Sequence, residues 1–141
     1  MRFAARALLI GTLTLGIAGS PAFAAAAKKP QLDMAHPGSV ALIEQANGAI
    51  YRHAETGFSL YVSDRDKPGV STCNEGCARA WVPLAVDPAD KKDVGNWSII
   101  KREDGSRQWA YKGQPVYTLF HDSIEKPIGN GVEGVWYFLE P

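Results

Sequence analysis

The chain has 141 residues, with 15 basic and 15 acidic side chains and therefore no formal net charge. This balance argues against nucleic acid or an anionic membrane surface as a partner, because both require clustered positive charge. The length is enough for one domain with a modest hydrophobic core.

Residues 1–24 have the layout of a secretory signal peptide. A short basic start precedes an apolar run at residues 7–18, and Ala22-x-Ala24 provides a small-residue cleavage signal. The run is shorter than the roughly 20 residues that span a bilayer, so we expect cleavage before Ala25 rather than a retained anchor. No cysteine stands near this point to carry a lipid. The predicted mature protein is therefore periplasmic or secreted, without a membrane anchor.

The first half of the predicted mature chain combines a lead, short strands and one helix. Residues 25–39 have little hydrophobic periodicity and predict a flexible N-terminal lead. Residues 40–46 suit either a weak helix or a first strand. Apolar and polar residues alternate over 58–63, which predicts a strand with two chemically different faces. Residues 72–75 then have the spacing of a capping box, so we expect a short helix that ends at Pro83.

The second half predicts further strands. Residues 97–101 and 107–111 are rich in aromatic and branched side chains and flank an Asp-Gly turn, a pattern that predicts a β-hairpin. Residues 116–120 predict a strand that begins after Pro115, where a missing N–H matters least. Residues 135–139 predict the last strand.

One sequence pattern occurs twice in the chain. Residues 57–66 are followed by Trp81, and the similar stretch 113–122 is followed by Trp136. A tandem repeat of this kind indicates one supersecondary unit duplicated, with the two copies burying their apolar faces against each other.

The repeats define the predicted fold class, which is mainly β with one or two short helical turns. We expect a small single domain over residues 40–141, built from two tandem β-rich repeats at about 48–84 and about 97–141. Whether they close one barrel-like sheet or pack as a sandwich stays open.

Cys73 and Cys77 are the only cysteines of the chain. In an exported protein this pair predicts a disulfide, which in so short a loop contributes roughly 2 kcal/mol and fixes a local turn. Around the equivalent positions the second repeat instead has Gly129, Gly131 and Gly134, which make a tight turn through backbone freedom. The three-residue gap between the cysteines differs from dithiol oxidoreductases, and haem attachment needs a histidine after the second cysteine. No cofactor is therefore predicted, with metal or haem binding as the weaker alternative.

His121, Asp66 and Asp122 are candidates for chemistry. His121 is adjacent to Asp122 at the end of a repeated strand, so it could act as a ligand or base, although a surface histidine is the plainer interpretation. Asp66 and Asp122 occupy equivalent positions and could form a carboxylate pair for metal binding or glycoside chemistry. The favoured interpretation is local: each accepts backbone N–H bonds in the turn that follows it. The sequence identifies no metal ligand set.

Four tryptophans give the small domain a high aromatic content. Trp81 and Trp136 recur at the same place in each repeat, which makes them core candidates. Trp109 and Tyr111 lie on one face of a predicted hairpin strand; we expect them to be partly exposed and consider them candidate ligand-binding residues with His121.

Residues 57–84 resemble the first unit of the bacterial secreted-repeat family, which is described as predicted lipoproteins with a Tyr-x-(Phe/Trp/Tyr)-x-x-Asp motif. Residues 108–136 are similar to the second unit of that family. The resemblance implies an exported envelope protein of tandem-repeat type for which no activity is established. It marks as family-motif positions Tyr61, Asp66, Trp81, Tyr117, Asp122 and Trp136.

The chain departs from the family pattern at three points. It lacks the cysteine to which a lipid would be attached, and the aromatic position of the motif holds Ser63 in the first repeat and Leu119 in the second. A ligand platform would lose part of its surface through these changes, whereas a packing position tolerates leucine.

These observations favour an exported, non-catalytic envelope protein that binds a small ligand or another envelope protein. The sequence contains no Gly-rich phosphate loop, no Ser-centred elbow and no His-Glu-x-x-His motif. The alternative is a periplasmic redox or metal-handling accessory, for copper or haem, that uses Cys73, Cys77 and His121.

Overall fold

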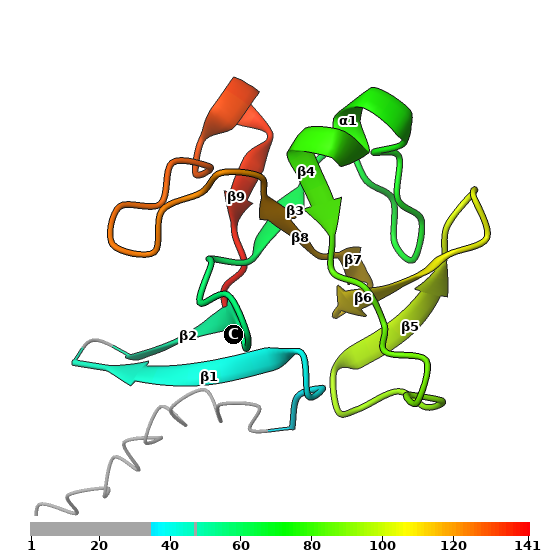
Figure 1. Ribbon diagram of the computed structural model, residues 1–141, viewed down its shortest axis with the longest axis horizontal. Coiled ribbons are helices and arrows are strands. Elements are labelled where there is room, and N and C mark those ends of the chain that lie inside the picture. The colour runs from blue at the N-terminus through cyan, green and yellow to red at the C-terminus, as the bar shows by residue number, and fades with distance from the viewer. Residues whose placement is uncertain (1–34, 47) are drawn as a thin grey trace, which may run out of the picture.

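The computed structural model describes residues 35–46 and 48–141 of the chain (Figure 1). The predicted signal peptide, and the predicted lead as far as residue 34, lie outside the described residues. The described part is mainly β, as predicted, with nine short strands, one α-helix and one 3-10 turn. No helix among these residues has the length and apolar character needed to cross a membrane.

The first two strands form a hairpin at one end of the domain (Figure 1). β1 (Val40–Gln45) pairs antiparallel with β2 (Gly48–His53), so residues 40–46 take the extended alternative rather than the helical one. Two backbone bonds tie the segment before β1 to this hairpin: Val40 N–H donates to the Pro37 carbonyl at 3.0 Å, and Ala54 N–H to the Ser39 carbonyl at 2.8 Å.

A four-stranded sheet interleaves the two repeats. β3 (Tyr61–Ser63) and β4 (Trp81–Pro83) come from the first repeat, and β8 (Tyr117–Leu119) and β9 (Trp136–Phe138) from the second. Their order in the sheet is β4-β8-β3-β9. Each inner strand therefore has a neighbour from the other repeat, and at the centre Tyr61 lies directly opposite Tyr117.

A separate three-stranded sheet contains the predicted hairpin. β5 (Trp97–Lys101) pairs with β6 (Arg107–Tyr111), which also pairs with β7 (Gln114–Pro115). The strand predicted at 116–120 is interrupted, because Val116 lies between β7 in this sheet and β8 in the four-stranded sheet. The Val116 N–H donates to the Trp109 carbonyl at 3.0 Å, and the Val116 carbonyl accepts from Leu84 N–H at 2.9 Å. Val116 therefore joins the two sheets.

The helix begins later and ends earlier than predicted. α1 spans Glu75–Ala80 with Asn74 as its N-cap, so the capping box on Thr72 is wrong. The Thr72 hydroxyl instead donates to the Arg65 carbonyl and to Asp66, which holds this residue in the preceding turn. The helix ends before Pro83, because the chain enters β4 at Trp81. The second helical turn is η1 (Val132–Gly134).

Two hydrophobic cores lie on opposite sides of the chain at β3. Leu60 and Val62 belong to the larger core, which also contains Tyr51, Trp97 and other residues. Tyr61, between them in sequence, belongs to the smaller core. The alternation predicted at 58–63 therefore does separate two different faces, and both faces are buried.

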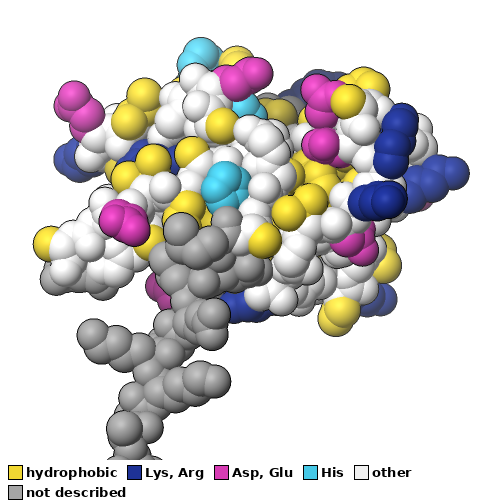
Figure 2. Space-filling model, turned by 90° about the horizontal axis from the view of Figure 1, so that it is seen from below, with side chains coloured by type: hydrophobic (Ala, Val, Ile, Leu, Met, Phe, Trp, Pro, Cys, Tyr) yellow, Lys and Arg dark blue, Asp and Glu magenta, His cyan; other side chains and the backbone are white. Residues whose placement is uncertain are grey.

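The surface on the β1 side has no dominant charge. Seen from below in the orientation of Figure 1, its visible part shows hydrophobic side chains scattered among acidic, basic and histidine side chains (Figure 2).

Candidate functional site

Tyr61 and Tyr117 connect the two repeats through reciprocal hydrogen bonds. The Tyr61 hydroxyl donates to Asp122 Oδ2 at 2.7 Å, and the Tyr117 hydroxyl donates to Asp66 Oδ2 at 2.7 Å. The tyrosine of each motif thus reaches the aspartate of the other motif. The interleaved strand order makes this exchange possible, because it sets the two tyrosines side by side.

The second oxygen of each aspartate accepts a backbone bond from the turn that follows it. Asp66 Oδ1 accepts from Thr72 N–H at 2.7 Å, and Asp122 Oδ1 accepts from Ile128 N–H at 3.0 Å. This is the local role that the sequence favoured. Each of the four carboxylate oxygens accepts a hydrogen bond from within the domain, which supports this local role for both aspartates.

Both tyrosines stay protonated at physiological pH. Burial raises the pKa of the Tyr61 phenol well above its ordinary value of 10.0, and the hydrogen bond to Asp122 raises it further. Burial also raises the pKa of Tyr117; the bond from Ser71 opposes this shift and the bond to Asp66 adds to it. A carboxylate acceptor favours the neutral phenol as donor, so these hydroxyls are structural donors rather than nucleophiles.

Trp81 and Trp136 form the centre of the smaller core, as their recurrence predicted. Their rings stack with centroids 3.8 Å apart and planes 6° apart. The edge of Tyr61 packs against Trp81 at 5.4 Å, and that of Tyr117 against Trp136 at 5.1 Å. Leu119, at the aromatic position of the motif, packs against the same cluster, so this position serves packing.

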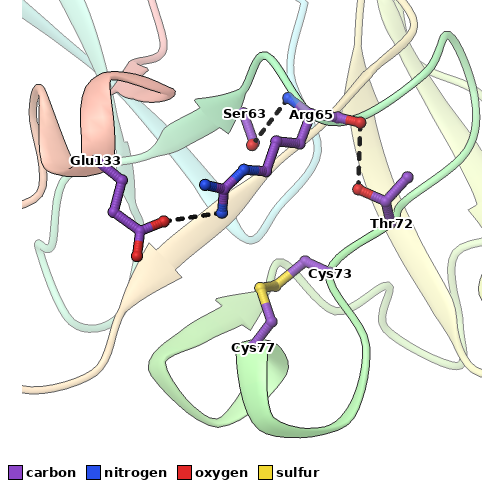
Figure 3. A network of polar contacts seen from close by, with 6 residues as sticks. All are labelled: Ser63, Arg65, Thr72, Cys73, Cys77 and Glu133. Atoms are coloured by element: carbon purple, nitrogen blue, oxygen red, sulfur yellow. Dashed lines mark hydrogen bonds and ion pairs between the residues drawn. A yellow bond between two sulfur atoms is a disulfide. The ribbon is translucent and has the colours of Figure 1, made fainter.

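The disulfide predicted between Cys73 and Cys77 is present, and Figure 3 shows it beside the turn that contains Arg65. Cys73 is buried, whereas Cys77 is exposed. The Arg65 carbonyl accepts from the Thr72 hydroxyl at 3.2 Å, and its guanidinium pairs with Glu133 at 2.8 Å. Both side chains of this ion pair are more than half exposed, so it contributes little to stability.

At the equivalent place in the second repeat, Gly129 allows a close approach. A Cβ atom there would lie 2.6 Å from two atoms of the Tyr61 ring. The Gly129 N–H also donates to the Tyr61 hydroxyl at 3.3 Å. The second repeat therefore packs its turn against the motif tyrosine of the first without any crosslink.

Arg102 is a buried cation that sequence reasoning missed. Its Nη1 donates to Gln108 Oε1 at 2.6 Å and to Ser71 Oγ at 2.8 Å, and its Nη2 donates to the Cys73 carbonyl at 2.6 Å. Ser71 Oγ lies 2.7 Å from the Tyr117 hydroxyl, so a chain of hydrogen bonds leads from Arg102 to Asp66. Nothing in the local pattern marks Arg102, since arginines that follow a strand are usually exposed.

The three candidate ligand-binding residues do not form one site. His121 is exposed with φ +59°, and its ring lies 3.9 Å from the ring of its neighbour Phe120. Trp109 and Tyr111 are 0% and 2% exposed, so the expectation of partial exposure is wrong. They are covered because β6 is the central strand of its sheet and because Tyr51 of β2 packs against Tyr111 at 5.3 Å.

A groove of about 680 Å³ lies where β2, the β6–β7 turn and the C-terminal segment meet. Apolar residues that line it include Ile50, Leu60 and Phe138, and charged residues include Arg52 and Lys112. Its volume is in the range of small-molecule sites, which are mainly apolar with a few placed polar groups.

Tyr111 also lines this groove. Its hydroxyl is buried and has no hydrogen-bond partner among the described residues. A buried polar group without a partner costs about 1–3 kcal/mol. The indole nitrogens of Trp97 and Trp109 in the same core are also unpaired within the described part of the chain, whereas the buried phenols of Tyr61 and Tyr117 are paired. Among the residues that the structure describes, no group of three or more His, Cys, Asp or Glu side chains is arranged to hold a metal ion.

Comparison with known proteins agrees with the sequence resemblance. Residues 98–140 match the family described as a secreted repeat of unknown function. This stretch contains the second motif, Tyr117 to Asp122, and β9. The similarity to the secreted-repeat family is therefore confirmed over the second repeat, and it supports an exported protein. No curated protein and no solved structure matches the chain significantly.

Proposed function

We propose that the chain is an exported, non-catalytic binding module of the cell envelope and that the groove beside Tyr111 is its ligand site. The observation that carries this proposal is the groove itself, with its apolar wall, two cationic side chains and a buried hydroxyl that lacks a partner. The motif residues support a non-catalytic role, because their hydrogen-bonding groups are engaged in holding the repeats together.

A blocked groove tests this function. Ala49 lines the groove from β2 and is half-buried, so Ala49→Trp should fill it while the hairpin persists. The matched control is Ala89→Trp, on an exposed loop outside the groove. The probes are three decyl compounds, decanoate, decanol and decyltrimethylammonium, titrated below their micellar concentrations into ¹⁵N-labelled mature protein.

The proposal is supported if at least one probe causes saturable changes in the amide chemical shifts of β2, Lys112 and the C-terminal segment. Ala49→Trp should abolish these changes, and Ala89→Trp should keep them. If none of the three probes causes saturable shifts there, the groove is not a ligand site and the proposed function fails.

Redox handling is a second candidate, favoured by the exposure of Cys77 in the Cys73–Cys77 disulfide. An exposed sulfur is open to attack by a thiolate, which is how disulfides exchange. Protein prepared from the periplasm should then contain a measurable fraction of chains that iodoacetamide alkylates twice. A preparation that stays unalkylated in mild dithiothreitol, which reduces exchangeable disulfides, would contradict this candidate and identify the bond as structural.

A further inference from the structure

We propose that the groove selects an amphipathic acid, with the apolar body along Ile50 and Phe138 and the acidic head between Arg52 and Lys112. This inference rests on the proposed function and assigns a ligand class to the same site.

The apolar wall is preformed. Leu60 is 1% exposed and belongs to the larger core, so its position is fixed by packing. Phe138 is 37% exposed, and its ring stacks on Tyr61 at 5.3 Å. A ligand that covers the free side of Phe138 would bury apolar surface at little ordering cost, because the ring is already held.

Arg52 is a cation held in place without a counter-charge. Its Nη1 donates to the Gly57 carbonyl at 2.8 Å and to the Ile124 carbonyl at 3.2 Å. Both acceptors are neutral, and within the described part of the chain its guanidinium forms no ion pair. These hydrogen bonds use one nitrogen and fix the group beside Gly57 and Ile124, and its other N–H donors form no hydrogen bond within the described residues, so they can bind an anion.

Lys112 supplies the second cation. Its ammonium lies 4.8 Å from the centre of the Tyr111 ring, and its backbone has φ +48° in the tight turn between β6 and β7. It too lacks an ion-pair partner among the described residues. Glu140 lines the groove as well, but no acidic group of the described residues lies within ion-pair distance of Arg52 or Lys112. Two unpaired cations favour an anionic head over a neutral or cationic one.

The test compares three ligands that share a ten-carbon chain and differ in their head group. Isothermal titration with decanoate, decanol and decyltrimethylammonium should give about tenfold tighter binding for decanoate than for decanol, the effect of one charge-assisted contact. Lys112→Met should lower that ratio, because only Arg52 then remains to pair with the acid, and should leave decanol binding unchanged. Lys101→Met, on an exposed position of β5 outside the groove, is the matched control and should keep the full ratio.

The outcomes separate the two proposals. If the three probes bind equally, or decyltrimethylammonium binds best, the acid preference is wrong while the groove remains a ligand site. If Lys101→Met lowers the ratio as much as Lys112→Met, the preference comes from overall charge and the assigned position is wrong. If no probe binds, the proposed function itself fails.

Discussion

The Tyr61 hydroxyl donates a 2.7 Å hydrogen bond to Asp122, 61 residues further along the chain, in a buried setting. Tyr117 and Asp66 repeat this contact in the opposite direction. The Tyr and Asp of the repeated motif are therefore partners across the repeats, and neither repeat completes its own motif. This relationship explains why the motif residues must occur twice in one domain.

Removal of the Tyr61 hydroxyl tests this relationship. Tyr61→Phe keeps the ring and leaves Asp122 without one buried partner, so we expect a loss of about 1–3 kcal/mol in the free energy of unfolding. Tyr111→Phe is the matched control: its hydroxyl has no partner, so the substitution should be neutral or stabilising. Urea unfolding measures both. Equal losses in the two variants would mean that the Tyr61–Asp122 bond has no special role.

The raised pKa values of Tyr61 and Tyr117 predict a loss of stability at alkaline pH. The unfolded chain ionises its tyrosines near pH 10, whereas the folded chain keeps these two protonated at that pH. Above pH 10 the folded state therefore binds more protons than the unfolded state, and the free energy of unfolding falls as pH rises.

The measurement is urea unfolding at a series of pH values between 8 and about 11.5. The double variant Tyr61→Phe with Tyr117→Phe should be less stable at pH 8 and should show a flatter alkaline decline than the wild type. An alkaline decline of the same slope in both proteins would assign it to other groups.

Gly129→Ala should destabilise the domain, because its Cβ would meet the Tyr61 ring at 2.6 Å. The ring is buried, so relief requires a shift in the smaller core, and the expected cost is about 1–3 kcal/mol. Gly76→Ala is the control, since no atom lies within 4 Å of its Cβ and it is in α1. Compared with the wild type, thermal unfolding should show a lower midpoint for Gly129→Ala and an equal or higher midpoint for Gly76→Ala.

The disulfide should stabilise the fold without being required for it. Replacement of both Cys73 and Cys77 by serine should cost roughly 2 kcal/mol, the chain-entropy value for so short a loop. The near-ultraviolet circular dichroism of the stacked Trp81 and Trp136 should persist, because these rings lie in the sheet and pack with both tyrosines. An unfolded double variant would show that the bond does more than fix a turn.

Local patterns predicted the parts of the fold that depend on neighbours in sequence. The hairpin around Asp104-Gly105 and the disulfide follow from short-range chemistry, and both are present. The repeated tyrosines and aspartates were visible as a motif, but their exchange of partners depends on the strand order β4-β8-β3-β9, which one repeat alone does not encode.

The features that the sequence predicted wrongly or missed also depend on contacts between segments that are distant in sequence. Tyr111 was expected to be partly exposed because a hairpin strand usually has a solvent face, whereas Tyr51 of the β1–β2 hairpin covers it. The groove was not predicted at all, since β2, the β6–β7 turn and the C-terminal segment are distant in sequence. Only the unusual density of aromatic residues gave any sign that these segments would pack together.

Arg102 provides the last prediction, because its loss should weaken the contact between the hairpin sheet and the disulfide turn. Arg102→Met keeps the apolar stem but leaves Gln108 and the Cys73 carbonyl without their donor. Several buried acceptors without partners should cost about 2–4 kcal/mol. Arg65→Met, which removes only the exposed pair with Glu133, should cost less than about 1 kcal/mol. Amide exchange should quicken at Cys73 and Ser71 in the first variant alone, and equal effects of the two substitutions would refute the buried network.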